Sequence, residues 1–341
     1  MQNTNLKEKL TEISEAVEPV IKKLLTQGVE ESTSDLVFYQ CKLGGKRIRP
    51  ALVVLSGQVF GGELEGLLYP AASVEILHNS TLVIDDIIDH SDIRRDQPTT
   101  WKKYGKSIAE CVAFDYLAAV FAGIGNVNNG AKLIDLYSKT LKVIIDGEIK
   151  DILFERSGRE DEDFVVNNRY KIITKDDYFK MISQKTAVLL QACCKAGAIY
   201  ANATDEQVEL MGEFGYNIGI AFQIRDDMLD IFADEKEFGK KVGKDIIEKK
   251  MGNYIILLAL EQLDEGGKKS ITDLLEGPNE VSDEDIARVT ELVEKTSAKS
   301  DAEKTAEHFI QKALDALGQL PQNEATQYLA ELANYIVSRS K

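Results

Sequence analysis

The chain has 341 residues, enough to bury a substantial hydrophobic core as one large domain or as two. Its formal net charge is −16, which argues against nonspecific binding to nucleic acid, because phosphate contacts need a basic surface. No apolar run approaches the roughly 18 residues of a membrane span, and the polar N-terminus lacks the apolar core of a signal peptide, so we expect neither. The four cysteines show no C-x-x-C spacing, which predicts reduced thiols in a cytoplasmic protein.

Apolar residues recur with helical periodicity through almost the whole chain. In chain order, the pattern predicts helices over residues 4–27, 31–43, 49–60, 66–95, 107–127, 131–157, 175–201, 205–233 and 251–265, and several amphipathic helices from 266 to 339. Breaks are expected where Gly, Pro and charge combine, at residues 44–50, 94–107 and 233–245. There is no convincing strand pattern, no flexible linker and no internal repeat. We therefore predict an all-α fold, in a single domain over residues 1–341.

The segment TLVIDDIIDH, residues 81–90, places three carboxylates among apolar side chains. Asp85, Asp86 and Asp89 share one arc of a helix at about 100° per residue. A carboxylate that is partly buried between apolar side chains without a counter-charge costs free energy, so this cluster needs a cationic partner. The same spacing recurs in FQIRDDMLDIF, at Asp226, Asp227 and Asp230. Two such clusters favour Mg²⁺ bound together with phosphate oxygens over two solvated surface clusters.

Basic residues gather beside these carboxylates in an otherwise acidic chain, which predicts a pocket for diphosphate groups. They are Lys46, Arg47, Arg49, Arg94, Arg95, Lys185, Lys240, Lys241, Lys244, Lys249 and Lys250. A di-iron bundle is the competing metal site, because Glu75 and His78 form a Glu-x-x-His pair. Such a site needs a second copy, and neither His90 nor His308 has a Glu three residues before it.

The ordered set of GGKRIRP, HNSTLVIDDIID, RRDQPTTW, QKT, FQIRDDMLD and GKKVGKD resembles the trans-isoprenyl diphosphate synthases, which are head-to-tail prenyltransferases. The resemblance covers roughly residues 40–255 and extends to the C-terminal YIVSRSK. It implies a bundle of about a dozen helices around a central cavity, usually in a homodimer. It also implies that the enzyme condenses isopentenyl diphosphate with an allylic diphosphate.

The resemblance further implies roles for individual residues. The two aspartate triplets would hold three Mg²⁺ ions on the allylic diphosphate. The head group of isopentenyl diphosphate would bind Lys46, Arg49, His78 and Arg95. The allylic diphosphate would bind Arg94, Lys185 and Lys244. The oxygens of Thr186 and Gln223 would face the developing allylic cation, so that these two residues and Lys185 form the expected catalytic set.

Product length is expected to depend on the residues just before Asp85. In the family that the chain resembles, an aromatic residue four or five positions before the first Asp stops growth early, but here Ser80 and Thr81 are small. The next candidate floors are Leu77, about 12 Å deeper along the helix, and Phe114 or Phe121 on the following helix. At this depth we expect products of roughly 20 to 35 carbons.

The chain departs from the family pattern in a few places, at Asp96, at Phe114 and over residues 249–254, which leaves the role of Lys250 open. Two other functions remain as alternatives. A class I terpene cyclase typically has a different second metal motif, whereas this chain repeats DDxxD in full. A noncatalytic partner subunit of another prenyl synthase tends to lose an aspartate motif, whereas both are present here.

Overall fold

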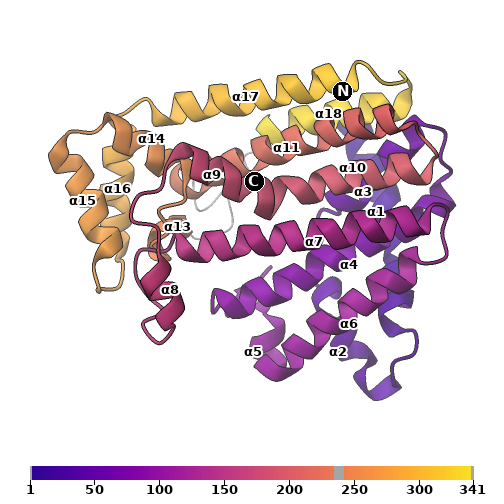
Figure 1. Ribbon diagram of the computed structural model, residues 1–341, viewed down its shortest axis with the longest axis horizontal. Coiled ribbons are helices and arrows are strands. Elements are labelled where there is room, and N and C mark those ends of the chain that lie inside the picture. Colours follow the sequence, from indigo (N-terminus) through magenta and orange to yellow (C-terminus); the bar gives the residue numbers. More distant parts are fainter. Residues whose placement is uncertain (1, 234–241, 339–341) are drawn as a thin grey trace. The chain divides into compact units, whose positions relative to one another are not determined.

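A computed structural model describes residues 2–233 and 242–338. Most of these residues are helical, which confirms the predicted all-α class (Figure 1). The one small sheet among them is a hairpin of β1 (Ile93–Arg94) and β2 (Gln97–Pro98), antiparallel, with Ile93 opposite Pro98. The chain divides into two compact units. Unit 1 comprises Met1–Lys139, Ala192–Gly212 and Leu317–Glu331, and unit 2 comprises Thr140–Gln191, Glu213–Ala316 and Leu332–Lys341. The single domain stays a prediction.

Unit 1 is built around α4 (Leu64–Ile88), a mostly buried helix. The helices that pack against it are α1 (Gln2–Thr26), α2 (Glu31–Lys42), α3 (Ile48–Val59), α5 (Thr100–Tyr104) and α6 (Lys106–Ile124). Near its C-terminal end, Val83 and Ile87 are buried against Ala109 and Ala113 of α6. The two alanines let α6 approach closely, so the end of α4 that carries the first aspartate triplet rests on a rigid apolar support.

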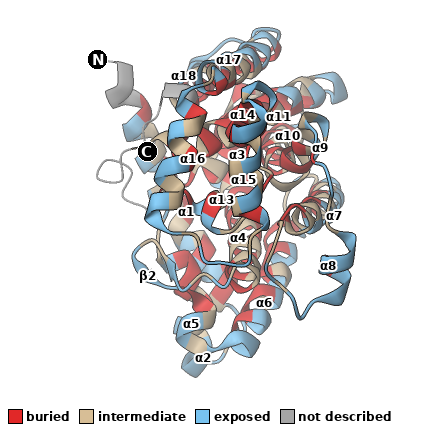
Figure 2. Ribbon diagram, turned by 90° about the vertical axis from the view of Figure 1, so that its left-hand side faces the viewer, coloured by how far each residue is buried: buried red, intermediate tan, exposed pale blue. Residues whose placement is uncertain are grey.

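Unit 2 contains most of the later helices. They are α8 (Asp163–Asn168), α9 (Lys175–Ile182), the π-turn η1 (Ser183–Ala187), α13 (Lys244–Ile247), α14 (Tyr254–Gln262), α15 (Glu265–Glu276) and α16 (Asp283–Glu294). Five helices contribute residues to both units: α7 (Gly130–Leu153), α10 (Val188–Tyr200), α11 (Asp205–Phe232), α17 (Ala298–Leu317) and α18 (Glu324–Ser338). Within unit 2, α14 packs on α9 and α16, and most of α8 is exposed (Figure 2).

Two of the helices predicted over 4–265 differ from those observed by more than about four residues at an end or by an interruption. The helix expected over 66–95 ends at Ile88, because His90, Arg95 and Asp96 have positive φ values of 51°, 53° and 59° and turn the chain into the hairpin. The helix expected over 175–201 is interrupted by η1. Neither a local turn nor an extra residue in one helical turn changes the apolar periodicity enough to be seen in the sequence.

One described helix, α6, is long and apolar enough to cross a membrane by length and composition alone. Within its most apolar window, 44% of the residues are buried inside the structure, and core helices of globular proteins pass the same test.

Candidate active site

The first aspartate triplet lies at the C-terminal end of α4. Asp85 occupies its last turn, and Asp89 is the C-cap residue, whose N–H donates to the Asp85 carbonyl at 2.8 Å. Both side chains are partly exposed. Asp86 is buried and accepts three hydrogen bonds from Arg94 of β1: from Nε at 2.9 and 3.0 Å, and from Nη2 at 2.7 Å. This forked pair holds the hairpin to α4, so it engages the predicted metal ligand Asp86 and the predicted diphosphate ligand Arg94 with each other.

A basic cluster surrounds His78, which lies nearly two turns before Asp85. Burial, then the charges of Arg49 and Arg95 and, more weakly, of Arg94 and Arg47, lower the pKa of His78 well below its usual range. His78 is therefore neutral near pH 7 and can offer a hydrogen bond but not a charge. Three of the four residues predicted for the isopentenyl diphosphate head group thus lie close together, while Lys46 is exposed in the loop before α3.

Arg95 shows most directly what this cluster can bind. Its Nη1 atom is buried, and no hydrogen-bond partner lies within reach among the described residues. Burial, and the nearby Arg47 and Arg94, lower the pKa of Arg95 despite the opposing charge of Glu75. A Cβ atom at Gly45 would lie 3.0 Å from Arg95 Nη2, so glycine here leaves room beside the guanidinium. A buried guanidinium with an unused donor, among other cations, is suited to an anion such as a diphosphate.

The second aspartate triplet lies near the C-terminal end of α11. Asp227 is buried and accepts hydrogen bonds from the Tyr178 hydroxyl at 2.8 Å, the Tyr254 backbone N–H at 2.9 Å and Gln223 Nε2 at 2.9 Å. Burial, then the charge of Asp245, raises the pKa of Asp227 well above its usual range. These three donors join α9, α11 and α14, so Asp227 organises the core of unit 2.

Asp230 has a different environment. Its carboxylate accepts the backbone N–H groups of Lys244 at 2.9 Å and Asp245 at 3.1 Å, at the start of α13. Burial, then Asp245, raises the pKa of Asp230 to about 7. A nearby cation would favour its ionised form. The predicted diphosphate ligand Lys244 pairs through Nζ with Glu248 at 3.0 Å, and Lys240 and Lys241 lie outside the described residues.

The donor set fits Mg²⁺ without a preformed cage. Within residues 2–233 and 242–338, no three His, Cys, Asp or Glu side chains already converge on one point. Mg²⁺ usually takes only one or two carboxylates and completes its octahedron with water and substrate phosphate oxygens. The partly exposed Asp85, Asp89, Asp226 and Asp230 suit that role. Their partners Asp86 and Asp227 are committed to protein donors and fit it less well than the sequence predicts.

Two glycines enclose the π-turn that carries Lys185 and Thr186. A Cβ atom at Gly147 of α7 would lie 2.5 Å from the Lys185 backbone nitrogen, and one at Gly219 of α11 would lie 2.6 Å from Ala187 Cα. Only glycine allows this approach. Single π-turns in helices are frequent at functional sites. Here the turn directs the Thr186 hydroxyl to Gln223 Oε1 at 2.9 Å, so the structure brings these two predicted catalytic residues into contact.

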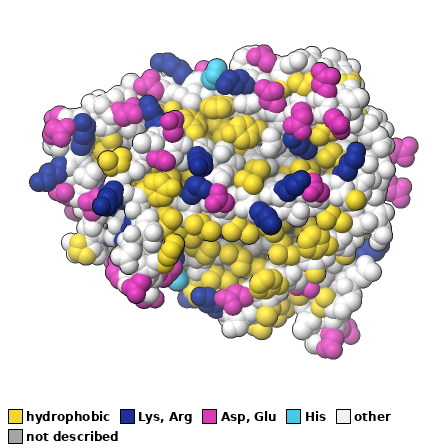
Figure 3. All heavy atoms as spheres, in the orientation of Figure 1, with side chains coloured by type: hydrophobic (Ala, Val, Ile, Leu, Met, Phe, Trp, Pro, Cys, Tyr) yellow, Lys and Arg dark blue, Asp and Glu magenta, His cyan; other side chains and the backbone are white. Residues whose placement is uncertain are grey.

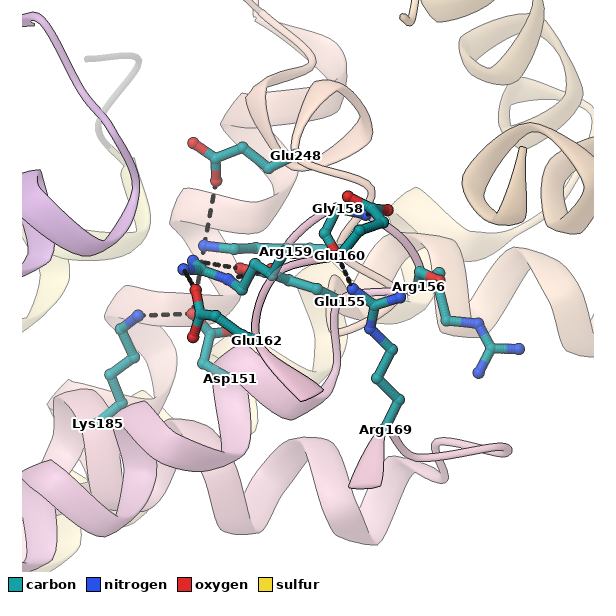
Figure 4. Close-up of polar contacts among 11 residues, drawn as sticks. Asp151, Glu155, Arg156, Gly158, Arg159, Glu160, Glu162, Arg169, Lys185 and Glu248 are labelled. Carbon is teal, nitrogen blue, oxygen red and sulfur yellow. Dashed lines mark hydrogen bonds and ion pairs between the residues drawn. The ribbon is translucent and has the colours of Figure 1, made fainter. Parts of the chain in front are cut away.

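Lys185 is held by carboxylates that sequence reasoning did not single out. Its Nζ lies 2.6 Å from Asp151 (Figure 4). It also lies 2.7 Å from Glu148, and both carboxylates belong to α7. Lys250 Nζ lies 3.3 Å from Asp151 and 3.1 Å from Glu248, so Lys250 bridges these two carboxylates. Although burial opposes it, the charges of Lys185 and Lys250 keep the pKa of Asp151 below its usual range. The network presents Lys185 as an anchored cation.

The residues predicted to control product length divide into two groups. Leu77 and Ser80 are buried in α4, and Thr81 is partly exposed, with its hydroxyl donating to the His78 carbonyl at 2.9 Å. Phe114 and Phe121 are 74% and 48% exposed on α6. A floor inside a tunnel of one chain must be enclosed, so this exposure argues against Phe114 and Phe121 in that role. The helical periodicity of apolar residues does not reveal which face of α6 is exposed, because α6 is apolar around most of its circumference.

An all-α fold with two aspartate triplets, a buried basic cluster and an anchored lysine defines the class of isoprenyl diphosphate synthases. The chain belongs to the polyprenyl synthetase family, whose model matches residues 30–293. It is therefore an enzyme, a trans-prenyl diphosphate synthase, as the sequence predicts.

Named relatives cover nearly the whole chain. Geranylgeranyl diphosphate synthase of Sulfolobus acidocaldarius is 35% identical over 332 residues, covering 94% of this chain and 95% of that protein. Heptaprenyl diphosphate synthase component 2 of Bacillus subtilis is 32% identical, covering 94% and 87%. The crystal structure of geranylgeranyl pyrophosphate synthetase from Pyrococcus horikoshii matches with a TM-score of 0.89 and 29% identity, covering 99% of this chain and 100% of that one.

Proposed function

We propose that the enzyme uses Mg²⁺ to condense isopentenyl diphosphate with an allylic diphosphate, giving a trans-polyprenyl diphosphate of roughly 20 carbons or more. The observation that carries this proposal is the basic cluster of unit 1, where Arg95 keeps a buried donor without a protein partner. A buried donor left unsatisfied costs free energy, which a bound diphosphate would recover. The relatives named for geranylgeranyl and heptaprenyl diphosphate synthesis support the range of lengths.

The isopentenyl diphosphate head group is assigned to Lys46, Arg49, His78 and Arg95. Three cations bind the diphosphate charge, and neutral His78 adds a hydrogen bond without competing for a proton. Fixing this head group orients the double bond that attacks the allylic carbon. Because the double bond is a weak nucleophile, holding it close to the reacting carbon supplies much of the rate enhancement.

The allylic diphosphate is assigned to Lys185, with Arg94 and Lys244 as further candidates. Asp85, Asp89, Asp226 and Asp230 would hold Mg²⁺, which would neutralise the charge that develops on the leaving diphosphate. Lys185, held by Asp151 and Glu148, places a fixed positive charge beside the same group. The C–O bond breaks, the double bond of isopentenyl diphosphate forms the new C–C bond, and the proton then lost passes to the released diphosphate. The oxygens of Thr186 and Gln223 stabilise the intervening cation.

The enzyme is further assigned to the cytoplasm as a homodimer. All four cysteines are free, and burial raises the pKa of Cys41 and Cys194 to about 12, so both stay unreactive. Hydrophobic side chains gather over α6 (Figure 3), where exposed Phe114, Ala118 and Phe121 share one face. The stripe is nearly symmetric about Ala118. A second copy related by a two-fold axis at Ala118 would therefore bring Phe114 of one copy close to Phe121 of the other.

A noncatalytic subunit is the second candidate, because one relative is named as component 2 of its synthase. Against it, this chain keeps both triplets and an anchored Lys185. Activity of the purified chain alone discriminates between the two.

Steady-state kinetics of head-group variants tests the assignment. We expect Lys46→Ala and Arg95→Ala to raise KM for isopentenyl diphosphate at least about tenfold, with a smaller change in KM for the allylic substrate. A matched Lys175→Ala variant removes an exposed cation paired with Glu261 and should change neither constant. If both substrates were affected equally by the head-group variants, the two diphosphate sites would be wrongly assigned.

A further inference from the structure

The loop before α3 adopts a conformation that needs external support. Gly44 and Gly45 have φ values of 82° and 145°, and Arg47, the N-cap residue of α3, has a φ of 48°. A non-glycine residue in the left-handed region is strained and persists only where its surroundings impose that conformation. The side chain of Arg47 supplies such surroundings.

The guanidinium of Arg47 is buried, and all three of its nitrogen atoms bond to acceptors of the protein. Its Nη2 donates to the Cys41 carbonyl at 2.8 Å and its Nη1 to the Gly44 carbonyl at 3.3 Å. Nε lies 2.6 Å from Glu18 of α1, and Nη1 lies 2.7 Å from Glu75 of α4. Arg47 thus ties the end of α2, the glycine loop and two further helices together. With its donors occupied in this way, Arg47 is not placed to bind a substrate.

The bonds of Arg47 connect to the predicted head-group residues in two ways, through the loop and through Glu75. Lys46 and Arg49 flank Arg47 in the sequence, so the loop conformation fixed by Arg47 sets where both project. Glu75 lies one turn before His78 on α4 and also accepts from Asn79 Nδ2 at 3.1 Å. Glu75 is buried at the base of the cluster, where its charge also acts on Arg95. A change at Arg47 would therefore shift Lys46 and Arg49 on one side of the cluster and, through Glu75, disturb His78 and Arg95 on the other.

Arginine is required here for geometry as well as charge. A planar guanidinium offers five donors in a fixed fork and can satisfy two carboxylates and two carbonyls at once, whereas a lysine ammonium offers three donors at one point. Replacement by lysine would keep the positive charge but leave some of these buried acceptors without a donor.

We propose that Arg47 is a positioning residue for the isopentenyl diphosphate head group, and that its bonds to Glu18, Glu75 and the Cys41 and Gly44 carbonyls hold Lys46 and Arg49 in their binding positions. This inference rests on the proposed function of the basic cluster. It assigns Arg47 no contact with substrate.

The test compares Arg47→Lys with Arg156→Lys. Arg156 is a matched control in unit 2, because its guanidinium also bonds two backbone carbonyls, of Tyr170 and Lys171, and a carboxylate, of Glu276. We expect Arg47→Lys to raise KM for isopentenyl diphosphate about tenfold, with KM for the allylic substrate changed less than twofold. Arg156→Lys should lower Tm comparably and leave both KM values unchanged.

Glu18→Gln is a milder second variant, because Glu18 is partly exposed and its loss leaves the Glu75 pair in place. It should raise the same KM about threefold, which keeps the test available if Arg47→Lys does not fold. The inference is overturned if the folded variants lose only thermal stability, or if KM for both substrates rises equally. If Arg95→Ala also leaves KM for isopentenyl diphosphate unchanged, the head-group assignment itself fails. If Arg95→Ala raises it and neither Arg47→Lys nor Glu18→Gln does, the positioning role alone fails.

Discussion

Gly147→Ala should impair catalysis through the π-turn without touching any charged group. The added Cβ would lie 2.5 Å from the Lys185 backbone nitrogen and 2.8 Å from the Gln184 carbonyl carbon. These are backbone atoms between two packed helices, so the turn must move by roughly 1 Å, at a cost of about 1–3 kcal/mol in stability. A misplacement of about 1 Å at catalytic groups lowers turnover on the order of 100-fold. Because Lys185 and Thr186 move together, we expect kcat to fall by about that factor.

The matched control is Gly212→Ala, also in a helix. There the added Cβ would lie even closer, 2.2 Å from Lys195 Cε, but the obstacle is a flexible side chain that can swing away. Steady-state rates and Tm of both variants should therefore separate: Gly212→Ala stays near the parent in both, and Gly147→Ala loses turnover while remaining folded by circular dichroism. If Gly147→Ala retained kcat within about threefold, the close approach of α7 to the π-turn would not set the position of Lys185.

Three further outcomes follow from the site. Asp85→Ala and Asp226→Ala should each lower turnover at least about a hundredfold with little change in Tm, because each removes a metal ligand rather than a core contact; near-normal rates in both would refute the metal assignment. Ser80→Phe should shift products toward about 15 carbons without abolishing turnover, measured by chromatography of the dephosphorylated products. An unchanged product distribution would mean that the growing chain does not pass this face of α4. Because the pKa of His78 is lowered in the folded state, the unfolded state takes up the proton more readily, so stability should fall as pH drops through about 6.5. His78→Gln should flatten that part of the Tm profile, and an identical profile in both proteins would contradict a neutral His78.

Local patterns predict the helices well, because apolar periodicity and capping residues act within a few positions of each other. The helix after GGKRIRP begins within one residue of its predicted start, and the helix that carries the first triplet begins within two. The end of the helix that carries the first triplet is missed by seven residues, because the positive φ values of His90 and Arg95 depend on packing of the hairpin rather than on a recognisable turn motif.

Long-range pairing is what the sequence cannot supply. Arg94 and Asp86 could each be recognised as functional residues, yet their mutual ion pair depends on how the hairpin folds back on α4. Glu148 and Asp151 resemble an ordinary solvated helix face, and only the meeting of α7 with the π-turn reveals them as partners of Lys185. Phe114, a candidate floor for the product, is 74% exposed on α6, which the nearly uniform apolar sequence of that helix does not indicate.

The most direct test incubates the purified chain alone with isopentenyl diphosphate, geranyl, farnesyl or geranylgeranyl diphosphate, and Mg²⁺, and sizes the products. We expect elongation to roughly 20 carbons or more, loss of the reaction on adding EDTA, and recovery when excess Mg²⁺ is restored. Failure of the folded chain to elongate any allylic substrate, or elongation that persists in excess EDTA, would contradict a Mg²⁺-dependent prenyl transfer by this chain.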